Sequence, residues 1–335
     1  MQLTDWLANL AGATVANRLA TLLDVPSDLQ TFPAERVPRA VLAQALNMLL
    51  FDDLVRRVPE GAAYVQDRLD AGEKICFDHG ALRTVLAPCG ALPVGQTAIT
   101  RILKPLGYQE AGTYPLPHLR MTGRAYCHID YPEQIAQFFV SELHPEQFSE
   151  SFQKTVQRVI GHSTDPLTSD HQQLLGRLQQ EKALPIAEAS YLMGGLLACF
   201  DRQHALPTSE DYDALLRESA EMAWISTEGN MLNHVTDRVV DVFSLTETQR
   251  ALGRSIKPQV EVSKNGRVRQ TALRAAQVER VFRTGQGSAL RKVPGSFYEF
   301  ITRDFYTDEK GQRHLDLTFD SANATGIFKM TDANM

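Results

Sequence analysis

Two segments of this chain share the same residue pattern, and this internal similarity limits the possible folds more than any other feature. Each segment reads apolar residue, Asp or Asn, His, three residues, Arg, one residue, Val. The first spans Phe77–Val85 and the second spans Leu232–Val240, so that His79 and His234 hold matching positions. A short helical stretch and an aliphatic-Lys-Pro sequence follow both segments at nearly the same distance. We therefore predict a duplicated module whose copies pair about a pseudo-twofold axis, with the two histidines close together at its centre.

The rest of the sequence fits around this duplication in four parts. Residues 1–72 and 150–222 carry apolar side chains at helical spacing. Residues 73–149 and 223–330 contain β-branched and aromatic runs that predict strands with short helices between them. In the first of these β-rich parts we expect helices at 97–106 and 132–138. This order predicts an α+β fold in which N-terminal and central helical regions are added to two half-modules of one catalytic domain.

The composition excludes several classes of protein. Lys and Arg number 34 against 40 Asp and Glu, and the net charge of −6 lacks the basic footprint of a nucleic-acid-binding protein. The sequence contains no run approaching the roughly 20 apolar residues that span a bilayer, and the first residues have no basic region typical of a signal peptide. The four cysteines form no C-x-x-C pair, which is typical of reduced intracellular thiols. We expect a cytoplasmic protein without nucleic-acid or membrane partners, and the oligomeric state stays open.

The two histidines are candidates for a ligand-binding site. Because residues two apart on a strand share a face, each histidine is expected to share its face with nearby alternate residues. For His79 and His234 these residues are, respectively, Phe77, Ala81 and Arg83, and Leu232, Thr236 and Arg238. Simple burial would leave imidazole and guanidinium groups unsatisfied on an otherwise apolar face. A cavity with a ligand resolves this conflict, and a pair of core histidines bonded to the backbone is the alternative.

Glu299 is the third candidate, because it lies between Tyr298 and Phe300 in a segment that otherwise reads as a buried strand. A carboxylate there is costly unless it is paired or binds a metal, and an ion pair with Arg303 is one explanation. Two imidazoles and one carboxylate also form the facial triad of a non-haem Fe(II) site, which leaves positions open for substrate and O₂. A catalytic zinc site uses the same ligands. His128 could lie beside such a site in a supporting role.

Four ordered motifs resemble the 2-oxoadipate dioxygenase/decarboxylase family, whose members are iron enzymes related to the vicinal-oxygen-chelate fold. The resemblance covers most of residues 73–328. The motifs are FDHGALRTV, TYPLPHLRMTGRAYCHID followed by QFFVSELH, GNMLNHVTDR and PGSFYEFITR. This resemblance implies duplicated vicinal-oxygen-chelate-like βαβββ modules that form a partly open β-barrel.

The resemblance also implies a chemistry and roles for particular residues. The implied iron ligands are His79, His234 and Glu299, and the implied clamp for a substrate carboxylate is Arg83, whose bidentate fork suits that task. The implied reaction is the Fe(II)-dependent oxidation of a 2-oxo acid by O₂, with 2-oxoadipate giving 2-hydroxyglutarate and CO₂. Alternative functions on the same fold are those of an extradiol or 4-hydroxyphenylpyruvate-type dioxygenase, a zinc or nickel isomerase, and a non-enzymatic small-molecule-binding protein.

Overall fold

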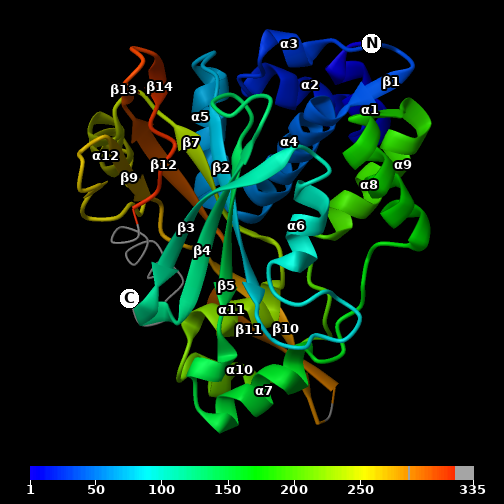
Figure 1. Cartoon of the computed structure of the whole chain (residues 1–335). Helices are drawn as coiled ribbons and strands as arrows, with labels where there is room; N and C mark the ends of the chain where they lie inside the picture. The colour runs from blue at the N-terminus through cyan, green and yellow to red at the C-terminus, as the bar shows by residue number, and fades with distance from the viewer. Residues whose placement is uncertain (286, 321–335) are drawn as a thin grey trace.

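A curled sheet of eight strands forms the centre of the computed structural model, which describes residues 1–285 and 287–320 (Figure 1). The strands lie in the order β3-β4-β5-β2-β7-β12-β9-β8. The four strands of the first half are β2 (Phe77–Val85), β3 (Tyr108–Leu116), β4 (Met121–His128) and β5 (Gln137–Leu143). Those of the second half are β7 (Leu232–Arg238), β8 (Glu261–Val262), β9 (Val268–Ala272) and β12 (Phe297–Arg303).

The two halves have the same topology, which confirms the predicted duplication. In each half the first strand is followed by a helix, α6 (Thr97–Leu103) or α12 (Val242–Ala251), and then by the other three strands. The first and last strands of each half, β2 with β5 and β7 with β12, pair in parallel. β2 and β7 pair antiparallel where the halves meet. The sheet therefore consists of two βαβββ modules related by a pseudo-twofold axis between β2 and β7, and it forms the partly open barrel that the family resemblance implies.

The central β2–β7 pair contains two bulges that obey the same pseudo-twofold relation. The register shifts between Phe77 and His79, so that Asp78 is the extra residue of β2. A matching shift on β7 makes Asn233 the extra residue, immediately before His234. A bulge inserts one unpaired residue and re-aims the side chains beside it. The repeated Asp/Asn-His sequence thus corresponds to a repeated bulge.

These bulges correct the alternation predicted from the sequence. Phe77 and Leu232 do not share a face with the two histidines, because each precedes a bulge residue. Phe77 instead packs against Phe51 with ring centroids 5.4 Å apart, and Leu232 belongs to the large apolar core on that side of the sheet. Beyond the bulge the alternation holds, and Ala81 lies on the same side as His79.

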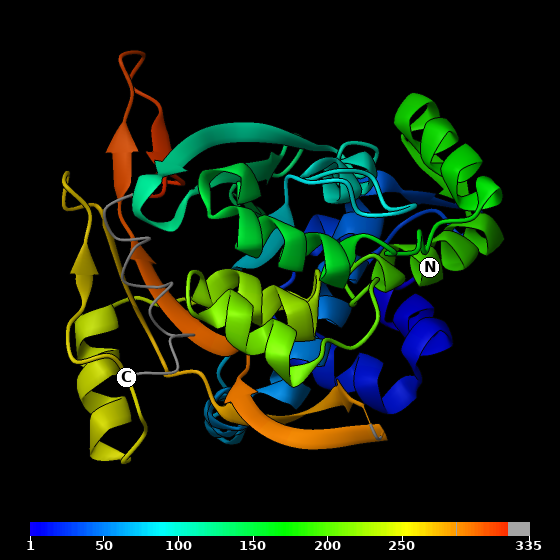
Figure 2. The same cartoon turned by 90° about the horizontal axis from the view of Figure 1, so that it is seen from below.

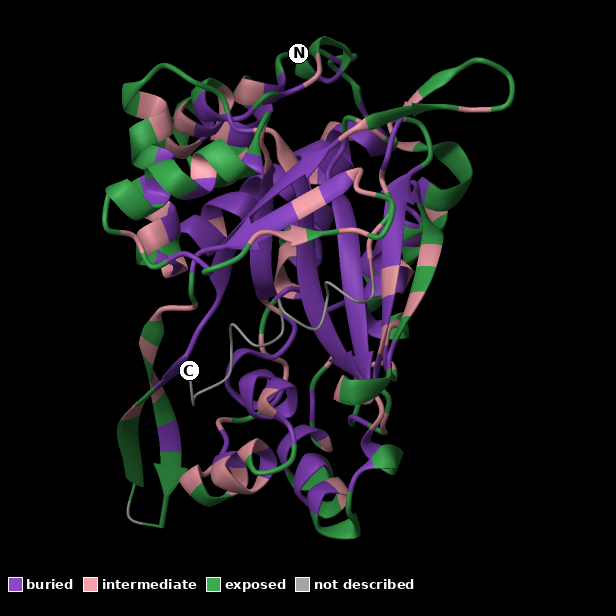
Figure 3. Ribbon diagram, turned by 90° about the vertical axis from the view of Figure 1, so that its left-hand side faces the viewer, coloured by how far each residue is buried: buried purple, intermediate pink, exposed green. Residues whose placement is uncertain are grey.

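Helices of the N-terminal region cover one face of the sheet. They are α1 (Leu3–Ala11), α2 (Ala13–Leu22), α3 (Ser27–Gln30), α4 (Arg39–Arg57) and α5 (Pro59–Asp70). Nearly every residue of α4 is buried, because this helix lies between the sheet and the outer helices. Figure 3 shows the inner strands of the central sheet as buried over most of their length, whereas the edge strands β3 and β8 are largely exposed or half-buried. The apolar core between α4, α5 and the sheet fixes this face as the structural side and leaves the opposite face for side chains with other roles.

The central helices form two groups. The helices are α7 (Glu150–Ile160), α8 (Ser169–Glu181), α9 (Ile186–Ala198), α10 (Ser209–Leu216) and α11 (Ala220–Glu228). The α9 helix packs on α4, and a small sheet joins the two regions through β1 (Arg36–Pro38) and β6 (Ala183–Pro185). The other group, α7, α10 and α11, packs with a hairpin of β10 (Gln277–Thr284) and β11 (Gly287–Pro294) (Figure 2). A second hairpin, β13 (Phe305–Thr307) and β14 (Arg313–Leu315), follows β12.

The helix predicted at 132–138 is wrong. Turn residues occupy 132–134, and β5 begins at Gln137 and runs to Leu143. Every residue of β5 is buried, because both faces of this strand are covered. A strand buried on both faces reads as a continuous apolar run without alternation, so its sequence does not separate it from a buried helix.

The domain boundaries that we predict from the sequence, at residues 72, 149 and 222, remain a proposal.

Within the two described ranges, no helix combines the length and the apolar character that crossing a membrane requires. All four cysteines carry free thiols.

Asp237 is a charged group on the helix-covered face of β7. Its side chain is 1% exposed, it accepts a hydrogen bond from Tyr64 Oη at 2.6 Å, and it accepts a second from the Cys76 amide at 3.1 Å. Burial raises the pKa of Asp237 to about 6. The folded protein therefore binds this proton more tightly than the unfolded chain does.

The substitution Asp237→Asn should remove a pH-dependent loss of stability. Because the folded-state pKa of about 6 lies above the ordinary value of 3.8, the free energy of unfolding falls as the pH rises through this interval. Asparagine does not titrate, so the stability of the variant relative to the parent should rise by about 1–3 kcal/mol between pH 4 and pH 7. Urea unfolding at four pH values measures this difference, with the exposed Asp5→Asn as control. A difference that stays constant with pH would contradict the assignment.

Candidate metal centre

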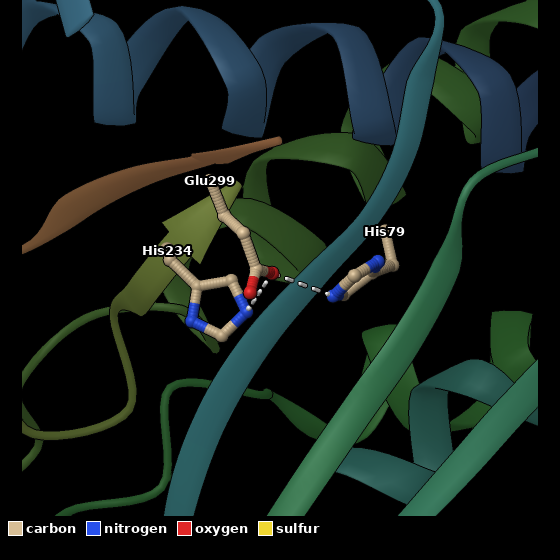
Figure 4. Close-up of side chains that lie close together, drawn as sticks. All are labelled: His79, His234 and Glu299. Atoms are coloured by element: carbon tan, nitrogen blue, oxygen red, sulfur yellow. Dashed lines mark ion pairs between the residues drawn. The ribbon is translucent and has the colours of Figure 1, made fainter. Parts of the chain in front are cut away.

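Three side chains from the adjacent strands β2, β7 and β12 meet on the face of the sheet opposite the N-terminal helices. His79 Nε2 and His234 Nε2 each lie 3.3 Å from Glu299 Oε2. Figure 4 shows the two rings directed toward the carboxylate. The ring centroids lie 5.5 Å apart and the ring planes are inclined at 84°. The structure thus brings together the three residues selected from the sequence.

Strand register explains this convergence. His79 pairs with Thr236 on β7, and Thr236 in turn pairs with Glu299 on β12. His234 lies two residues before Thr236 and therefore on the same face of β7. The Thr236 hydroxyl donates a hydrogen bond of 2.6 Å to Glu299 Oε2 and lies 3.1 Å from His79 Nε2. Thr236 orients the carboxylate between the two rings.

The electrostatics of the cluster favour an ionised carboxylate and shift the pKa values of the two rings in opposite directions. Burial by itself would raise the pKa of Glu299, but His234, His79 and the Thr236 hydroxyl lower it below its usual range. Burial lowers the pKa of His234 to about 3, so this ring is neutral at physiological pH. Burial also opposes protonation of His79, but the carboxylates of Asp78 and Glu299 outweigh it and raise the pKa of this ring.

The three residues fit a metal ion. Their potential ligand atoms all lie within 4.8 Å of one another, and all three side chains are buried. Glu299 Oε1 is buried and has no hydrogen-bond partner among the described residues. Two ligand atoms bound at about 2.1 Å and at right angles would lie about 3.0 Å apart, close to the 3.3 Å seen for both N···O pairs. Two imidazoles and a carboxylate suit Fe(II) or Zn(II), and the geometry does not separate these metals.

The pseudo-twofold axis shows which side of the cluster lacks a protein ligand. Ala81 pairs with Phe139 on β5, just as Thr236 pairs with Glu299 on β12. Phe139 therefore occupies the position in the first module that Glu299 occupies in the second. Its ring packs 4.8 Å from that of Phe319. An aromatic wall thus stands where a symmetric site would place a fourth ligand.

Arg83 does not belong to the triad, but it lies on β2 four residues beyond His79. Its side chain is fully buried, and its guanidinium carbon lies 5.0 Å from the centroid of the Trp224 ring. Burial lowers the pKa of Arg83 to about 10, while the charge of Glu221 acts in the opposite direction. The positive charge is close enough to contribute to the lowered pKa of His234. The structure thus places a buried cation near the cluster.

The structure does not give His128 the supporting role that the sequence left open for it. Its Nε2 lies 2.9 Å from the Leu106 carbonyl oxygen, and its Nδ1 accepts a hydrogen bond from the Asp130 amide. Burial lowers the pKa of His128 to about 4, so it is a neutral core histidine satisfied by the backbone.

Sequence reasoning missed the residues that support the triad. Asp78 Oδ1 lies 2.8 Å from His79 Nδ1, and Asn233 Nδ2 lies 3.2 Å from His234 Nδ1. The sequence did contain an indication of these supporting residues, because a polar residue, Asp or Asn, precedes the histidine in both copies of the repeat. Strict alternation assigned those residues to the opposite face, and only the bulges bring them beside the rings.

Comparisons with solved structures agree with this fold. A glyoxalase superfamily protein of Ralstonia eutropha JMP134 is 52% identical, with a TM-score of 0.89 over 95% of this chain and 98% of that chain. Hydroxyglutarate synthases of Oryza sativa and Pseudomonas putida, both in complex with 2-oxoadipate, are each 19% identical with TM-scores of 0.65. The matches cover 93% and 90% of this chain and 98% and 75% of those chains, respectively. At this level of identity the two synthases show a shared fold.

Sequence comparison assigns the chain to a family. Among curated proteins compared with the chain, none matches. A sequence model of the 2-oxoadipate dioxygenase/decarboxylases matches residues 42–332. This match spans both modules and all three residues of the candidate metal centre. The chain therefore belongs to the 2-oxoadipate dioxygenase/decarboxylase family, a family of enzymes.

Proposed function

We propose that this protein is an Fe(II)-dependent dioxygenase that converts a 2-oxo acid and O₂ into CO₂ and a 2-hydroxy acid one carbon shorter. With 2-oxoadipate, one O₂ is consumed and the products are 2-hydroxyglutarate and one CO₂, so that all atoms balance. The observation that carries the proposal is the buried cluster of His79, His234 and Glu299, in a chain that belongs to this enzyme family. Two relatives in fold were solved with 2-oxoadipate bound, which supports the choice of substrate.

His79, His234 and Glu299 would hold the metal, and Fe(II) bound there would supply the redox chemistry that activates O₂ and drives oxidative decarboxylation. The neutral ring of His234 and the ionised carboxylate of Glu299 are already in the protonation states that a metal requires. No protein ligand comes from the Phe139 position, so this side is left for the substrate.

The aromatic side chains around the cluster exclude water from the reacting atoms. Phe319 packs edge-on against His79 at 4.9 Å between centroids, and Phe297 lies 4.8 Å from His234. A dry wall strengthens the electrostatic interactions in the site and suppresses side reactions. These rings also offer an apolar surface to the carbon chain of a 2-oxo acid.

Arg83 would bind the remote carboxylate of a dicarboxylic substrate. Its guanidinium is fully buried on the same strand as His79, and a positive charge in such surroundings attracts an anionic group strongly. His79 and Arg83 are four residues apart, which is about 13 Å along a strand. The arginine side chain can extend toward His79 over part of this distance. A six-carbon dicarboxylate can span the gap that is left between the guanidinium and the metal site.

Oxygen uptake across a panel of substrates tests the proposed function. We expect the Fe(II)-loaded enzyme to consume O₂ and release CO₂ in equal amounts with 2-oxoadipate, and to be slower with 2-oxoglutarate and with catechols. An oxygen electrode and chromatography of the products measure these quantities. Turnover of catechol or 4-hydroxyphenylpyruvate alone would move the protein to another dioxygenase class. Bound iron without oxygen uptake on any 2-oxo acid would defeat the proposal.

The substitution Glu299→Gln should abolish stable metal binding while preserving the shape of the side chain. An amide lacks the charge that balances the cation, so we expect the affinity for Fe(II) or Mn(II) to fall by more than about 100-fold. Metal analysis after anaerobic loading and dialysis measures this loss. The matched control is Glu228→Gln, since Glu228 is a buried carboxylate that pairs with Arg280 away from the triad. Equal metal retention in both variants would contradict the ligand assignment.

The substitution Arg83→Ala should act on substrate selection and leave metal binding intact. For 2-oxoadipate we expect kcat/KM to fall by about 100-fold or more, because a buried charge pair is lost. For 2-oxohexanoate, which has the same chain length without the remote carboxylate, the change should be within about fivefold. Steady-state kinetics with both substrates and the Mn(II) affinity check this expectation. An equal loss with both substrates would show that Arg83 has a structural role.

A further inference from the structure

The residues that precede the two histidines are equivalent in position but differ in chemistry. Asp78 and Asn233 are the bulge residues of β2 and β7, and each contacts Nδ1 of the histidine that follows it. One contact is made by a carboxylate and the other by a neutral amide. The pseudo-twofold arrangement therefore offers an internal comparison in which the two rings differ in their supporting group.

Asp78 is the centre of a buried network of charges. It is fully buried, and its Oδ1 lies 2.8 Å from His79 Nδ1. Arg303 donates from Nε and Nη2 at 3.0–3.1 Å, and Arg238 donates from Nε at 2.7 Å. A histidine whose Nδ1–H is held by a fixed carboxylate has its tautomer and ring orientation set, so its Nε2 is directed outward as a ligand.

The network continues to the segment that covers the site. Arg303 Nη1 donates to the carbonyl oxygens of Asp316 and Thr318, both at 2.8 Å. The Arg303 guanidinium lies 5.0 Å from the ring centroid of Phe319, the same ring that packs on His79. One arginine thus contacts both the carboxylate behind His79 and the backbone that places Phe319 in front of it.

Asn233 has no comparable support. Its amide nitrogen lies 3.2 Å from His234 Nδ1, and its Oδ1 has no hydrogen-bond partner among the residues described. A rotated amide would present Oδ1 to the Nδ1–H that a ligating His234 carries, because the amide orientation follows the hydrogen-bond network. The support for His234 is then one neutral hydrogen bond.

We propose that Asp78 is a positioning residue that fixes the ring of His79 for metal binding and, through Arg303, ties that ring to the 316–319 segment. This inference rests on the proposed metal site and adds that its two histidines are held with different firmness. His79 is the firmly held ligand, and His234 is the ligand held by packing and a single neutral hydrogen bond. Metal affinity should accordingly depend on Asp78 more than on Asn233.

The test measures metal binding to the metal-free full-length protein without turnover. The probes are Mn(II), titrated by the EPR signal of the free ion, and Co(II), whose visible spectrum reports ligand geometry. For Asp78→Asn, which copies the residue found at 233, we expect the Mn(II) affinity to fall by about 10–100-fold and the Co(II) spectrum to change. For Asn233→Ser the affinity should stay within about fivefold.

The matched control for structural damage is Arg238→Gln. This variant removes one partly exposed partner of Asp78 but leaves the His79 contact and the Arg303 contacts in place. Its Mn(II) affinity should remain within about threefold of the parent. If Asp78→Asn does not fold, the test uses Arg303→Lys instead. Lysine keeps the positive charge but cannot make the several hydrogen bonds that the Arg303 guanidinium donates to Asp78. That variant should weaken Mn(II) binding by several-fold and alter the Co(II) spectrum.

The outcomes separate this inference from the proposed function. Parent-like affinity and spectrum in Asp78→Asn, or in Arg303→Lys where that variant replaces it, would overturn the inference. An equal weakening in Arg238→Gln would also overturn it. A parent protein that binds Mn(II) and Co(II) but consumes no O₂ with 2-oxo acids would defeat the proposed function and leave the inference standing. A parent protein that binds neither metal would overturn both.

Discussion

The antiparallel pairing of β2 with β7 is the constraint on which the rest of the structure depends. This pairing joins the two modules and places His79 beside Thr236 and Ala81 beside His234. A slip of one residue would turn every side chain of a strand to the opposite face. The bulges at Asp78 and Asn233 fix the register from both ends, so the triad forms only when both copies of the repeat have folded and paired.

The covering of the sheet follows from the same pairing. One face of β2 and β7 packs on α4 and its neighbours, and apolar side chains fill that interface. The other face can then carry groups that would be costly in an ordinary core, including the Glu299 carboxylate and the Arg83 guanidinium. Function is thereby separated from stability across the thickness of a single sheet.

Local sequence signals were sufficient for part of this arrangement. The repeat and the period of two predicted the shared position of His79 and His234, and the buried carboxylate at Glu299 stood out within its strand. The same period of two assigned Phe77 to the wrong face of the sheet, because strict alternation takes no account of the extra residue in a bulge. The helix expected at 132–138 failed since β5 is buried on both faces. The Asp78–Arg303 contact joins residues 225 positions apart, and no local pattern encodes such a pair.

The exchange of a carboxylate for a phenyl ring between positions 299 and 139 has a consequence for how such a protein can arise. An assembly of two identical half-modules must present the same residue at both positions, so its ligand set is symmetric. In a single chain, the two copies can be altered independently. Covalent fusion of the modules is therefore what permits one copy to contribute a carboxylate while the other contributes an aromatic surface. One side of the cluster then carries a protein ligand and the equivalent side does not, so a substrate can approach from one side only. A symmetric dimer could not have this difference.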